Sequence, residues 1–399
     1  MKTIALLSLI PVSLGFPLIS YQGNGDQRPL TLPLNEIGKQ AGFSLDLNEL
    51  RLVQFGDDEE PTWITEYEKI EAKAAGKNFF DITDTPELGL AINSISRKPF
   101  PTPTHGSQVT PVLKTLSTSG PRANLEKFTS FKTRYYRSAT GRESQRWLLS
   151  KIAEVTDKTA SPSLKKAISV SEFDHAWGQN SIILRIKGLN ETLTQEDGVV
   201  IISAHQDSTN MFPFFDAPGA DDDGSGTVTI LEAYRALIAA DFRPTRDVEF
   251  HWYSAEEGGL LGSQAVAKDY ASRHAPVRAQ IQFDMTAWVK KGTREEVGII
   301  TDYVSLDLTE FVKSLVDEYL AIPYAETKCG YACSDHASWG KAGYPSAFSI
   351  ESKFENSNQN IHSARDRIDI SPEFSFDHML EFSKLAVSFA VELGGWEKN

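Results

Sequence analysis

The sequence predicts an α/β protein, a three-layer sandwich in which a mixed, mostly parallel central sheet is flanked by helices. Short β-branched runs alternate along the chain with longer runs whose apolar residues recur at helical spacing. The short runs are almost continuously apolar, which is typical of strands that are buried on both faces. Such an alternation favours a sheet that carries helices on its two sides.

Each element can be assigned in chain order from residue 180 onward. Six apolar runs predict strands, at residues 180–188, 199–207, 247–257, 277–285, 296–302 and 344–352. Four amphipathic runs predict helices, at residues 226–242, 259–274, 305–320 and 374–393.

Length and charge restrict the class of protein. A chain of 399 residues, 40% hydrophobic and 24% charged, suits one large domain with or without an accessory segment. A mean hydropathy of -0.30 argues against a protein with several membrane spans. The formal net charge of -14 argues against a nucleic-acid partner.

The first residues predict secretion. Residues 1–15 combine an early lysine, an apolar run too short to span a membrane, and the small residues Ser13 and Gly15 near the expected cleavage point. We therefore expect a signal peptide and an extracellular protein. A buried N-terminal strand is the alternative. No later stretch predicts a membrane helix, so no membrane partner is expected.

Residues 16–95 differ in composition from the rest, because they carry -8 of the net charge. Residues 59–83 have a helical rhythm, and a Pro/Thr/Ser-rich stretch at 98–111 reads as a linker. This order predicts an acidic propeptide at 16–95, removed between residues 84 and 110, before a catalytic domain at 96–399. An ordinary small N-terminal domain is the alternative.

Two cysteines and one sequon suggest covalent modifications. Cys329 and Cys333 could close a small local loop, although reduced thiols or zinc ligation remain alternatives. Asn190 begins an Asn-Glu-Thr glycosylation sequon in a polar stretch.

Histidines and carboxylates follow the ends of the expected strands. Ligands in such sheets bind outside the carboxyl ends of the strands, so residues at those ends can meet at one edge. Imidazole combined with carboxylate suits zinc. Two ions about 3.5–4 Å apart need a shared carboxylate, which explains three adjacent aspartates in one glycine-rich loop. The residues at this edge are His205, Asp207, Asp221, Asp222, Asp223, Glu256, Glu257, Asp284 and His362.

Six motifs carry a family resemblance: HQD, PGADDDGSG, SAEEGGLLGS, QFDM, CGYACSDHASW and IHSARD. Their order and spacing resemble those of the secreted two-zinc aminopeptidases, in particular the extracellular leucine aminopeptidases of filamentous fungi. The resemblance covers about residues 120–395, and the leader resembles the fungal propeptide.

The resemblance implies two Zn²⁺ per chain. His205 and Asp284 would hold one ion, Glu257 and His362 the other, and Asp222 would bridge both. Glu256 would be the general base that activates a zinc-bridging water. The resemblance also implies a cis peptide bond between Asp222 and Asp223.

Further roles follow from the same resemblance. Asp207 would orient His205, and Tyr331 would donate a hydrogen bond to the developing oxyanion. A Cys329–Cys333 bridge would fix the tyrosine loop. Asp366 is a candidate to orient His362. Candidates for an apolar substrate pocket are Met285, Phe348 and Ile361.

The expected function is thus an extracellular metallo-aminopeptidase that removes leucine and other apolar residues from peptides with a free N-terminus. A glutaminyl cyclase or carboxypeptidase on the same fold, and a non-catalytic binding ectodomain, are the alternatives. The protein's own propeptide is an expected partner of the catalytic domain, and a monomer is the expected oligomeric state.

Overall fold

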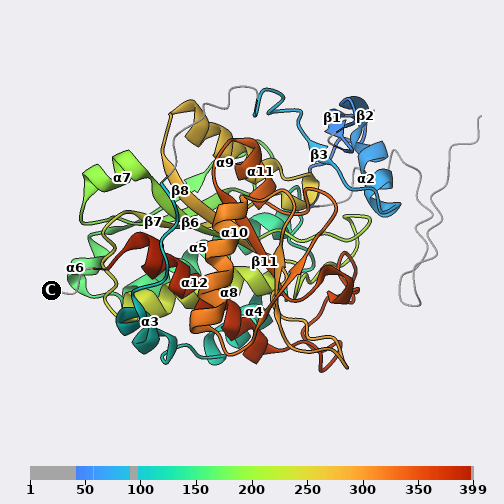
Figure 1. Cartoon of the computed structure of the whole chain (residues 1–399). Coiled ribbons are helices and arrows are strands. Elements are labelled where there is room, and N and C mark those ends of the chain that lie inside the picture. The colour runs from blue at the N-terminus through green and yellow to red at the C-terminus, as the bar shows by residue number, and fades with distance from the viewer. Residues whose placement is uncertain (1–41, 57, 90–97, 397–399) are drawn as a thin grey trace, which may run out of the picture.

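An eight-stranded sheet organises the protein (Figure 1). The structure, a computed structural model, describes residues 42–56, 58–89 and 98–396. The strand order is β10-β9-β11-β8-β6-β7-β5-β4, and four of the seven neighbouring pairs are parallel. The expected mixed, mostly parallel sheet is therefore confirmed. The strands are β4 (Ile168–Phe173), β5 (Ser181–Ile186), β6 (Val199–His205), β7 (Val248–Tyr253), β8 (Val277–Phe283), β9 (Val297–Ile300), β10 (Tyr324–Thr327) and β11 (Ser346–Ile350).

The central strands are the ones that the sequence indicates most clearly. Every residue of β6, β7 and β8 is buried, because helices cover both faces of the sheet there. The two edge strands, β4 and β10, were not among the expected strands. β4 has a mostly exposed pattern and β10 is only four residues long, so neither has a continuous apolar run.

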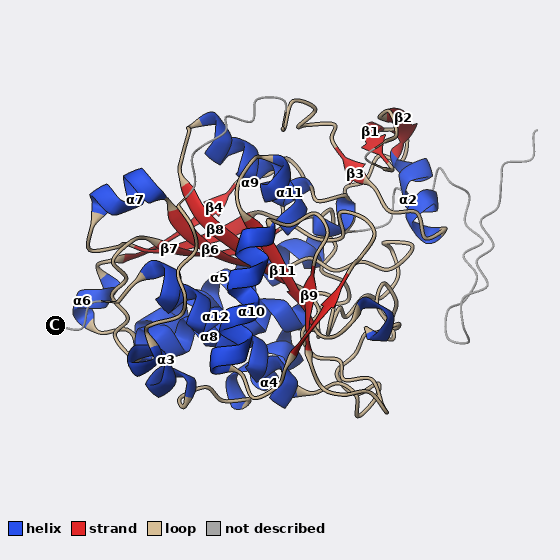
Figure 2. Ribbon diagram, in the orientation of Figure 1, coloured by secondary structure: helices blue, strands red, loops and turns tan. Residues whose placement is uncertain are grey.

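Two helical layers enclose the sheet (Figure 2). α8 and α12 pack on each other and on β6, and α3, α4, α5 and α10 pack around them. α9 and α11 pack against each other, and α11 also contacts β8 and β11. The helices of the larger layer are α3 (Gly106–Leu113), α4 (Ser119–Phe128), α5 (Ala139–Thr159), α8 (Gly224–Ala239), α10 (Leu306–Tyr319) and α12 (Phe376–Gly394). The others are α6 (Pro162–Lys165), α7 (Glu191–Asp197), α9 (Leu261–Ser272) and α11 (His336–Lys341).

A second, small sheet precedes this body. Its order is β2-β1-β3, built from β1 (Leu50–Gln54), β2 (Thr62–Thr65) and β3 (Phe80–Asp81), with α2 (Glu66–Ala74) packed on it. The helical rhythm read over residues 59–83 is therefore too long. Thr65 caps α2 in a reciprocal capping box with Glu68, which fixes the helix start after β2.

The expected linker at 98–111 is wrong in its second half. α3 begins at Gly106, and Val109 and Val112 are buried in the main core. Lys98 and Pro99 are also attached, since their carbonyl groups accept hydrogen bonds from Arg278. The chain is therefore packed on the main body from residue 98 onward.

In the part of the chain that the structure describes, no helix combines the length and apolar character that crossing a membrane requires. The expected signal peptide at residues 1–15 and the first part of the leader, to residue 41, lie outside the described residues.

Candidate metal centre and active site

Three parallel strands end at the same edge of the sheet and deliver most of the candidate residues. His205 is the last residue of β6, Asp284 follows β8 directly, and a 3-10 turn at Glu256–Gly258 follows β7. β6 pairs in parallel with both β7 and β8. Their carboxyl ends therefore meet at one level, as the sequence predicts.

His205 lies between two carboxylates. Its Nε2 atom is 3.2 Å from Asp222 Oδ1 and 3.6 Å from Asp284 Oδ1. The histidine is fully buried. Neither Nε2 nor Asp284 Oδ1 has a hydrogen-bond partner, which is unusual for buried polar atoms. Unpartnered donor atoms that converge in this way fit a shared cation.

A second group of donors lies on the other side of Asp222. His362 Nε2 is 3.0 Å from Asp222 Oδ2 and 3.1 Å from Glu257 Oε2. The second carboxylate oxygen of Glu257 has no hydrogen-bond partner. Burial lowers the pKa of His362, but Glu257 and Asp222 outweigh it and raise that pKa to about 9. The carboxylates around His362 therefore favour a positive charge at this position, and a bound divalent cation would supply one.

Asp222 is therefore the one aspartate of the three that faces both imidazoles, each with a different oxygen. The neighbouring Asp223 has donor atoms close to His205 and Asp284. Its oxygens are occupied, however, by the backbone N–H groups of His205, Gly226 and Met285. Asp223 thus caps α8 and links it to the chain at His205 and Met285 through hydrogen bonds. The Asp222 carboxylate remains available to bind metal ions. The peptide bond between them is cis.

The donor set fits zinc. The donor atoms of His205, Asp223 and Asp284 form one group and those of Asp222, Glu257 and His362 a second, and Asp222 also approaches His205 of the first group. Imidazole with carboxylate oxygen is a usual zinc environment. The candidate ligand His362 and three non-glycine residues close in sequence to other ligands, Ala255, Leu260 and Met285, have positive φ angles. Such sparsely populated conformations cluster at functional sites.

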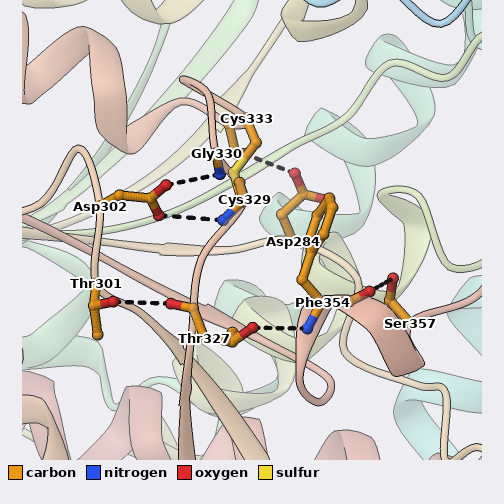
Figure 3. The surroundings of a disulfide bond; sticks show 10 residues. Asp284, Thr301, Asp302, Thr327, Cys329, Gly330, Cys333, Phe354 and Ser357 are labelled. Carbon is orange, nitrogen blue, oxygen red and sulfur yellow. Dashed lines mark hydrogen bonds between the residues drawn. A yellow bond between two sulfur atoms is a disulfide. The ribbon is translucent and has the colours of Figure 1, made fainter.

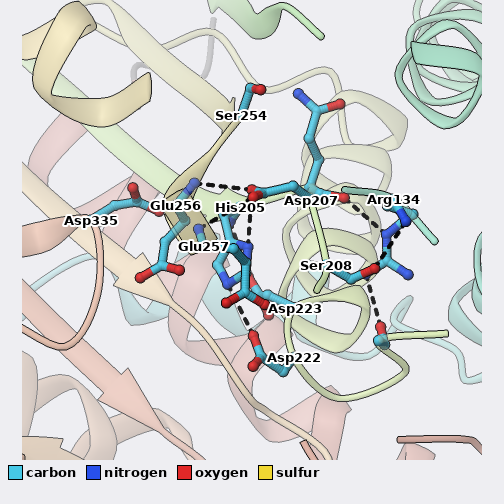
Figure 4. A network of polar contacts seen from close by, with 12 residues as sticks. Arg134, His205, Asp207, Ser208, Asp222, Asp223, Ser254, Glu256, Glu257 and Asp335 are labelled. Carbon is cyan, nitrogen blue, oxygen red and sulfur yellow. Dashed lines mark hydrogen bonds and ion pairs between the residues drawn. The ribbon is translucent and has the colours of Figure 1, made fainter. Parts of the chain in front are cut away.

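Asp207 connects the histidine to the two glutamates (Figure 4). Its Oδ1 atom lies 3.4 Å from His205 Nδ1 and also accepts the backbone N–H of Glu256, and its Oδ2 atom accepts that of Glu257. Burial raises the pKa of the Glu256 carboxyl well above its usual range, His205 lowers it, and Glu257 raises it further. A bound cation would oppose that rise and favour the carboxylate form.

Asp366 was a candidate to orient His362. Its two carboxylate oxygens accept the backbone N–H groups of Asp221 and Asp222. Asp221 is buried beside Ser225 and Asn358, which donate to its carboxylate. Both acidic residues therefore support the backbone of the aspartate loop.

Tyr331 sits on a loop closed by the Cys329–Cys333 disulfide (Figure 3). Asp302 accepts the backbone N–H groups of Cys329 and Gly330, at 3.2 and 2.7 Å, and so holds the start of that loop. Burial raises the pKa of the Tyr331 phenol, and the nearby Glu256 and Asp284 raise it further. Tyr331 is therefore a neutral hydroxyl donor beside the acidic cluster.

A cavity of about 360 Å³ opens above the candidate metal ligands. Asp222, Glu256, Glu257, Asp284 and His362 form its polar floor. The three pocket candidates lie on its apolar side, together with residues that the sequence analysis missed. Ile350 is two residues after Phe348 on β11, so strand alternation could have found it, whereas Phe354 had no such signal. The apolar wall comprises Met285, Phe348, Ile350, Phe354, Ile361 and Cys333.

Comparison with known proteins decides the family. Residues 181–386 match the family described as Peptidase family M28. The chain belongs to peptidase family M28. It is 46% identical to Leucine aminopeptidase 1 of Coccidioides posadasii (strain RMSCC 757 / Silveira) over 87% of this chain and 90% of that protein. It is 48% identical to Leucine aminopeptidase 1 of Sclerotinia sclerotiorum over 83% of this chain and 86% of that protein.

A solved structure agrees with this assignment. The Legionella pneumophila LapA aminopeptidase superposes with a TM-score of 0.74 at 27% identity, covering 89% of this chain and 96% of that chain. Together with the donor set, the family makes this protein a zinc-dependent aminopeptidase and a hydrolase.

The N-terminal segment adds a cation that the sequence analysis did not anticipate in this M28 peptidase. Lys73, the penultimate residue of α2, places Nζ 2.5 Å from Glu257 Oε2 and 2.9 Å from the Glu257 carbonyl oxygen. Burial lowers the pKa of Lys73, but Glu257 and Glu256 outweigh it and raise it. Lys77, Asn78 and Phe79 continue along the cavity wall. No local sequence pattern in α2 indicates that Lys73, of its two lysines, contacts Glu257.

Proposed function

We propose that this M28 peptidase is a secreted enzyme that removes leucine and other apolar N-terminal residues from peptides with two zinc ions. One observation carries the proposal: Asp222 lies between two imidazoles at the floor of a cavity with an apolar side wall. The names of the 46–48% identical relatives support the preference for leucine.

The ligands would divide into two sets around Asp222. His205 and Asp284 would hold one ion, and Glu257 and His362 the other. Bound there, zinc would polarise the scissile carbonyl group and make a water molecule more acidic. The polar floor of the cavity is acidic, so the free α-ammonium group of a peptide is attracted to the same end.

Glu256 and Tyr331 would carry the proton transfer and the charge. The Glu256 carboxylate would take the proton of the attacking water and deliver it to the departing amine. Asp207 holds the Glu256 backbone in place through its N–H group. The Tyr331 hydroxyl would donate a hydrogen bond to the oxygen that becomes negative.

The apolar wall would select the N-terminal side chain. Met285, Phe348 and Ile361 would contact it, and the Cys329–Cys333 disulfide closes that side. Each methylene contributes only about 1–3 kcal/mol to discrimination in such a pocket, so the preference should be broad among apolar residues.

The N-terminal segment would act as an inhibitory propeptide of this active site. Lys73 binds Glu257, and four further contacts attach the segment to the turn and helix that follow: Asp81 N–H to Gly259 O, Gln264 Nε2 to Asp81 O, Thr85 Oγ1 to Gln264 Oε1, and Lys268 Nζ to Asp84 O. Lys73, Lys77, Asn78 and Phe79 of the segment line the cavity, so the segment would restrict the access of a substrate to it.

Contacts made by the residues on either side narrow the interval in which we expect the propeptide to be cut. Glu87 still pairs with Lys268 of the catalytic body, and Lys98 to Phe100 already pack against Arg278. We therefore place the cut between Glu87 and Lys98. Part of that interval, residues 90–97, lies outside the described residues.

Three further properties belong to the proposal. Residues 1–15 would direct secretion, Asn190 would carry a glycan, and the mature enzyme would be a monomer. Asn190 is exposed at the start of α7, where a glycan has room.

The test measures the zinc content of the enzyme and whether cleavage requires a free α-amine in the substrate. After limited proteolysis removes the segment, zinc is measured per chain and rates are measured on leucine p-nitroanilide and on its N-acetylated form. Two zinc ions and cleavage of the free-amine substrate alone are expected. Cleavage of the blocked substrate, or cyclisation of a glutaminyl peptide without hydrolysis, would contradict the proposal.

A further inference from the structure

Arg134 lies in the connection between α4 and α5, and Figure 4 shows it beside Asp207 and Ser208, to one side of the candidate metal ligands. Its side chain is completely buried. None of the ion pairs in the described part of the chain includes it. A buried guanidinium without a carboxylate partner is costly unless hydrogen bonds replace its hydration. Such a group therefore requires an explanation from its other partners.

Backbone carbonyl groups from both ends of the β6–α8 connection, residues 206–223, satisfy this guanidinium. Nε donates to Gln206 O at 2.9 Å, Nη2 donates to Gly219 O at 2.8 Å, and Nη1 donates to Pro218 O. The ring of Phe128 stacks on the guanidinium, 4.2 Å from its central carbon. The planar fork of arginine matches this arrangement, whereas a lysine ammonium could not span it.

One end of this connection adjoins His205, and the other end carries Asp222. Gln206 directly follows His205, and Pro218 and Gly219 lead into the aspartate loop. Ser208 reinforces the link, because its hydroxyl oxygen accepts the backbone N–H of Arg134 and donates to Ala217 O. The position of the bridging carboxylate relative to the histidine therefore depends on this connection.

The positive charge of Arg134 also stabilises the arrangement of the aspartates. Burial lowers the pKa of Arg134 to about 10, while Asp366, Asp207 and Asp223 oppose that decrease, so the guanidinium stays charged at neutral pH. A fixed positive charge near the aspartates reduces their mutual repulsion without occupying the cation positions.

We propose that Arg134 is a positioning residue for the zinc site: it holds the two ends of the β6–α8 connection together, so that His205 and Asp222 lie at the separation that metal binding requires. Arg134 lies outside the residues 181–386 that match the family. The proposal rests on the zinc site of the proposed function, and its test measures metal binding instead of peptide hydrolysis.

Arg278 provides a matched control. It is also a buried arginine that donates to two backbone carbonyls, Lys98 O at 2.6 Å and Pro99 O at 2.7 Å, and stacks on the ring of Phe100 at 4.3 Å. It belongs to the start of β8, whereas Asp284 follows the end of that strand. Arg278→Met thus removes the same chemistry away from the metal ligands.

The experiment uses the full chain and the variants Arg134→Met, Arg134→Lys and Arg278→Met. The zinc dissociation constant is measured by competition with a chelator, the absorption spectrum is recorded after Co²⁺ substitution, and Tm is measured without metal. Residues that orient metal ligands typically change metal affinity by about 10–100-fold. We expect Arg134→Met to raise the dissociation constant at least tenfold and to alter the Co²⁺ bands. Arg134→Lys should show a smaller change of the same kind, and Arg278→Met should lower Tm alone.

The proposal would be overturned if Arg134→Met, like Arg278→Met, lowered Tm but kept the wild-type zinc affinity and Co²⁺ bands. Arg134 would then have a structural role only. If the Arg134 variants do not fold, Ser208→Ala weakens the same connection more mildly and should raise the dissociation constant by a few-fold; an unchanged constant there would also overturn it. A wild-type chain that binds no zinc would instead refute the proposed function.

Discussion

Replacing Lys73 by methionine in the unprocessed chain should release part of its inhibition. Lys73 is the charged group of the N-terminal segment that contacts a proposed zinc ligand, through Glu257 Oε2 and the Glu257 carbonyl oxygen. Methionine keeps a similar apolar stem but cannot donate either hydrogen bond. The remaining contacts of the segment, with Gly259, Gln264 and Lys268, are not altered.

The size of the effect follows from those two contacts. A hydrogen bond to a charged group contributes about 1.5–3 kcal/mol, and every 1.4 kcal/mol corresponds to about a factor of ten. The Lys73 side chain is 20% exposed, so solvent screens only part of the interaction. We therefore expect the fraction of chains with an open cavity, and hence the activity, to rise about tenfold to a hundredfold.

The assay measures hydrolysis of leucine p-nitroanilide by unprocessed wild-type, Lys73→Met and Lys77→Met chains, with zinc content determined in the same samples. Lys77 is the matched control, because it follows the same helix and lies 5.8 Å from the Phe55 ring centre instead of reaching Glu257. Its variant should stay within about twofold of wild type. After proteolytic removal of the segment, all three proteins should have equal activity.

Two results would refute this reasoning. The first is an unprocessed Lys73→Met chain that is no more active than wild type although removal of the segment activates both. The second is an equal gain in the Lys77→Met chain, because a general loosening of the segment would then explain the activation.

Three other predictions concern the site and the segment. Glu256→Gln should lower kcat by about 10²–10⁴-fold with unchanged zinc content, as expected for a general base; a loss below tenfold would remove that role. At Gly226, alanine would place Cβ 2.3 Å from Asp223 Oδ1, so Gly226→Ala should lower Tm strongly, measured by calorimetry, and an unchanged Tm would contradict this packing. Burial raises the pKa of Asp81, but Lys69 and Arg51 outweigh it and lower that pKa to about 2. The depressed pKa stabilises the segment by about 2 kcal/mol above pH 4, and this is lost as the pH falls toward 2. Protease sensitivity of the segment should therefore rise over that range, and Asp81→Asn should abolish the pH step.

Much of the fold could be predicted from local pattern. The strands β5, β6, β7, β8, β9 and β11 all lie within the expected runs, because burial on both faces forces a nearly continuous apolar sequence. Of the edge strands, β4 is mostly exposed and β10 has only four residues, only one of them buried, so no continuous apolar run marks them. α5, the longest helix of the described residues at 21 residues, was not predicted either; few of its residues are buried and its apolar stripe is narrow.

The N-terminal part shows a different limit. Composition alone separated an acidic leader from the body, but it could not reveal that the leader contains its own small sheet. The linker prediction failed beyond residue 105 because proline and threonine are tolerated in α3 once Val109 and Val112 gain burial in the core. Tertiary burial outweighs local propensity there.

By itself, the sequence determined the order of the strands and helices around the site, the family resemblance and the residue types that suit zinc, since each depends on identity and spacing along the chain. The resemblance already implied Asp222 as the bridging aspartate, but only the tertiary structure gives the physical reason: adjacent aspartates have the same chemistry and differ in the direction of their side chains. It also brought Lys73 and Arg134 to the site from segments that lie 184 and 72 residues from their partners Glu257 and Gln206. Contacts over such distances depend on packing of the whole chain, which no local pattern encodes.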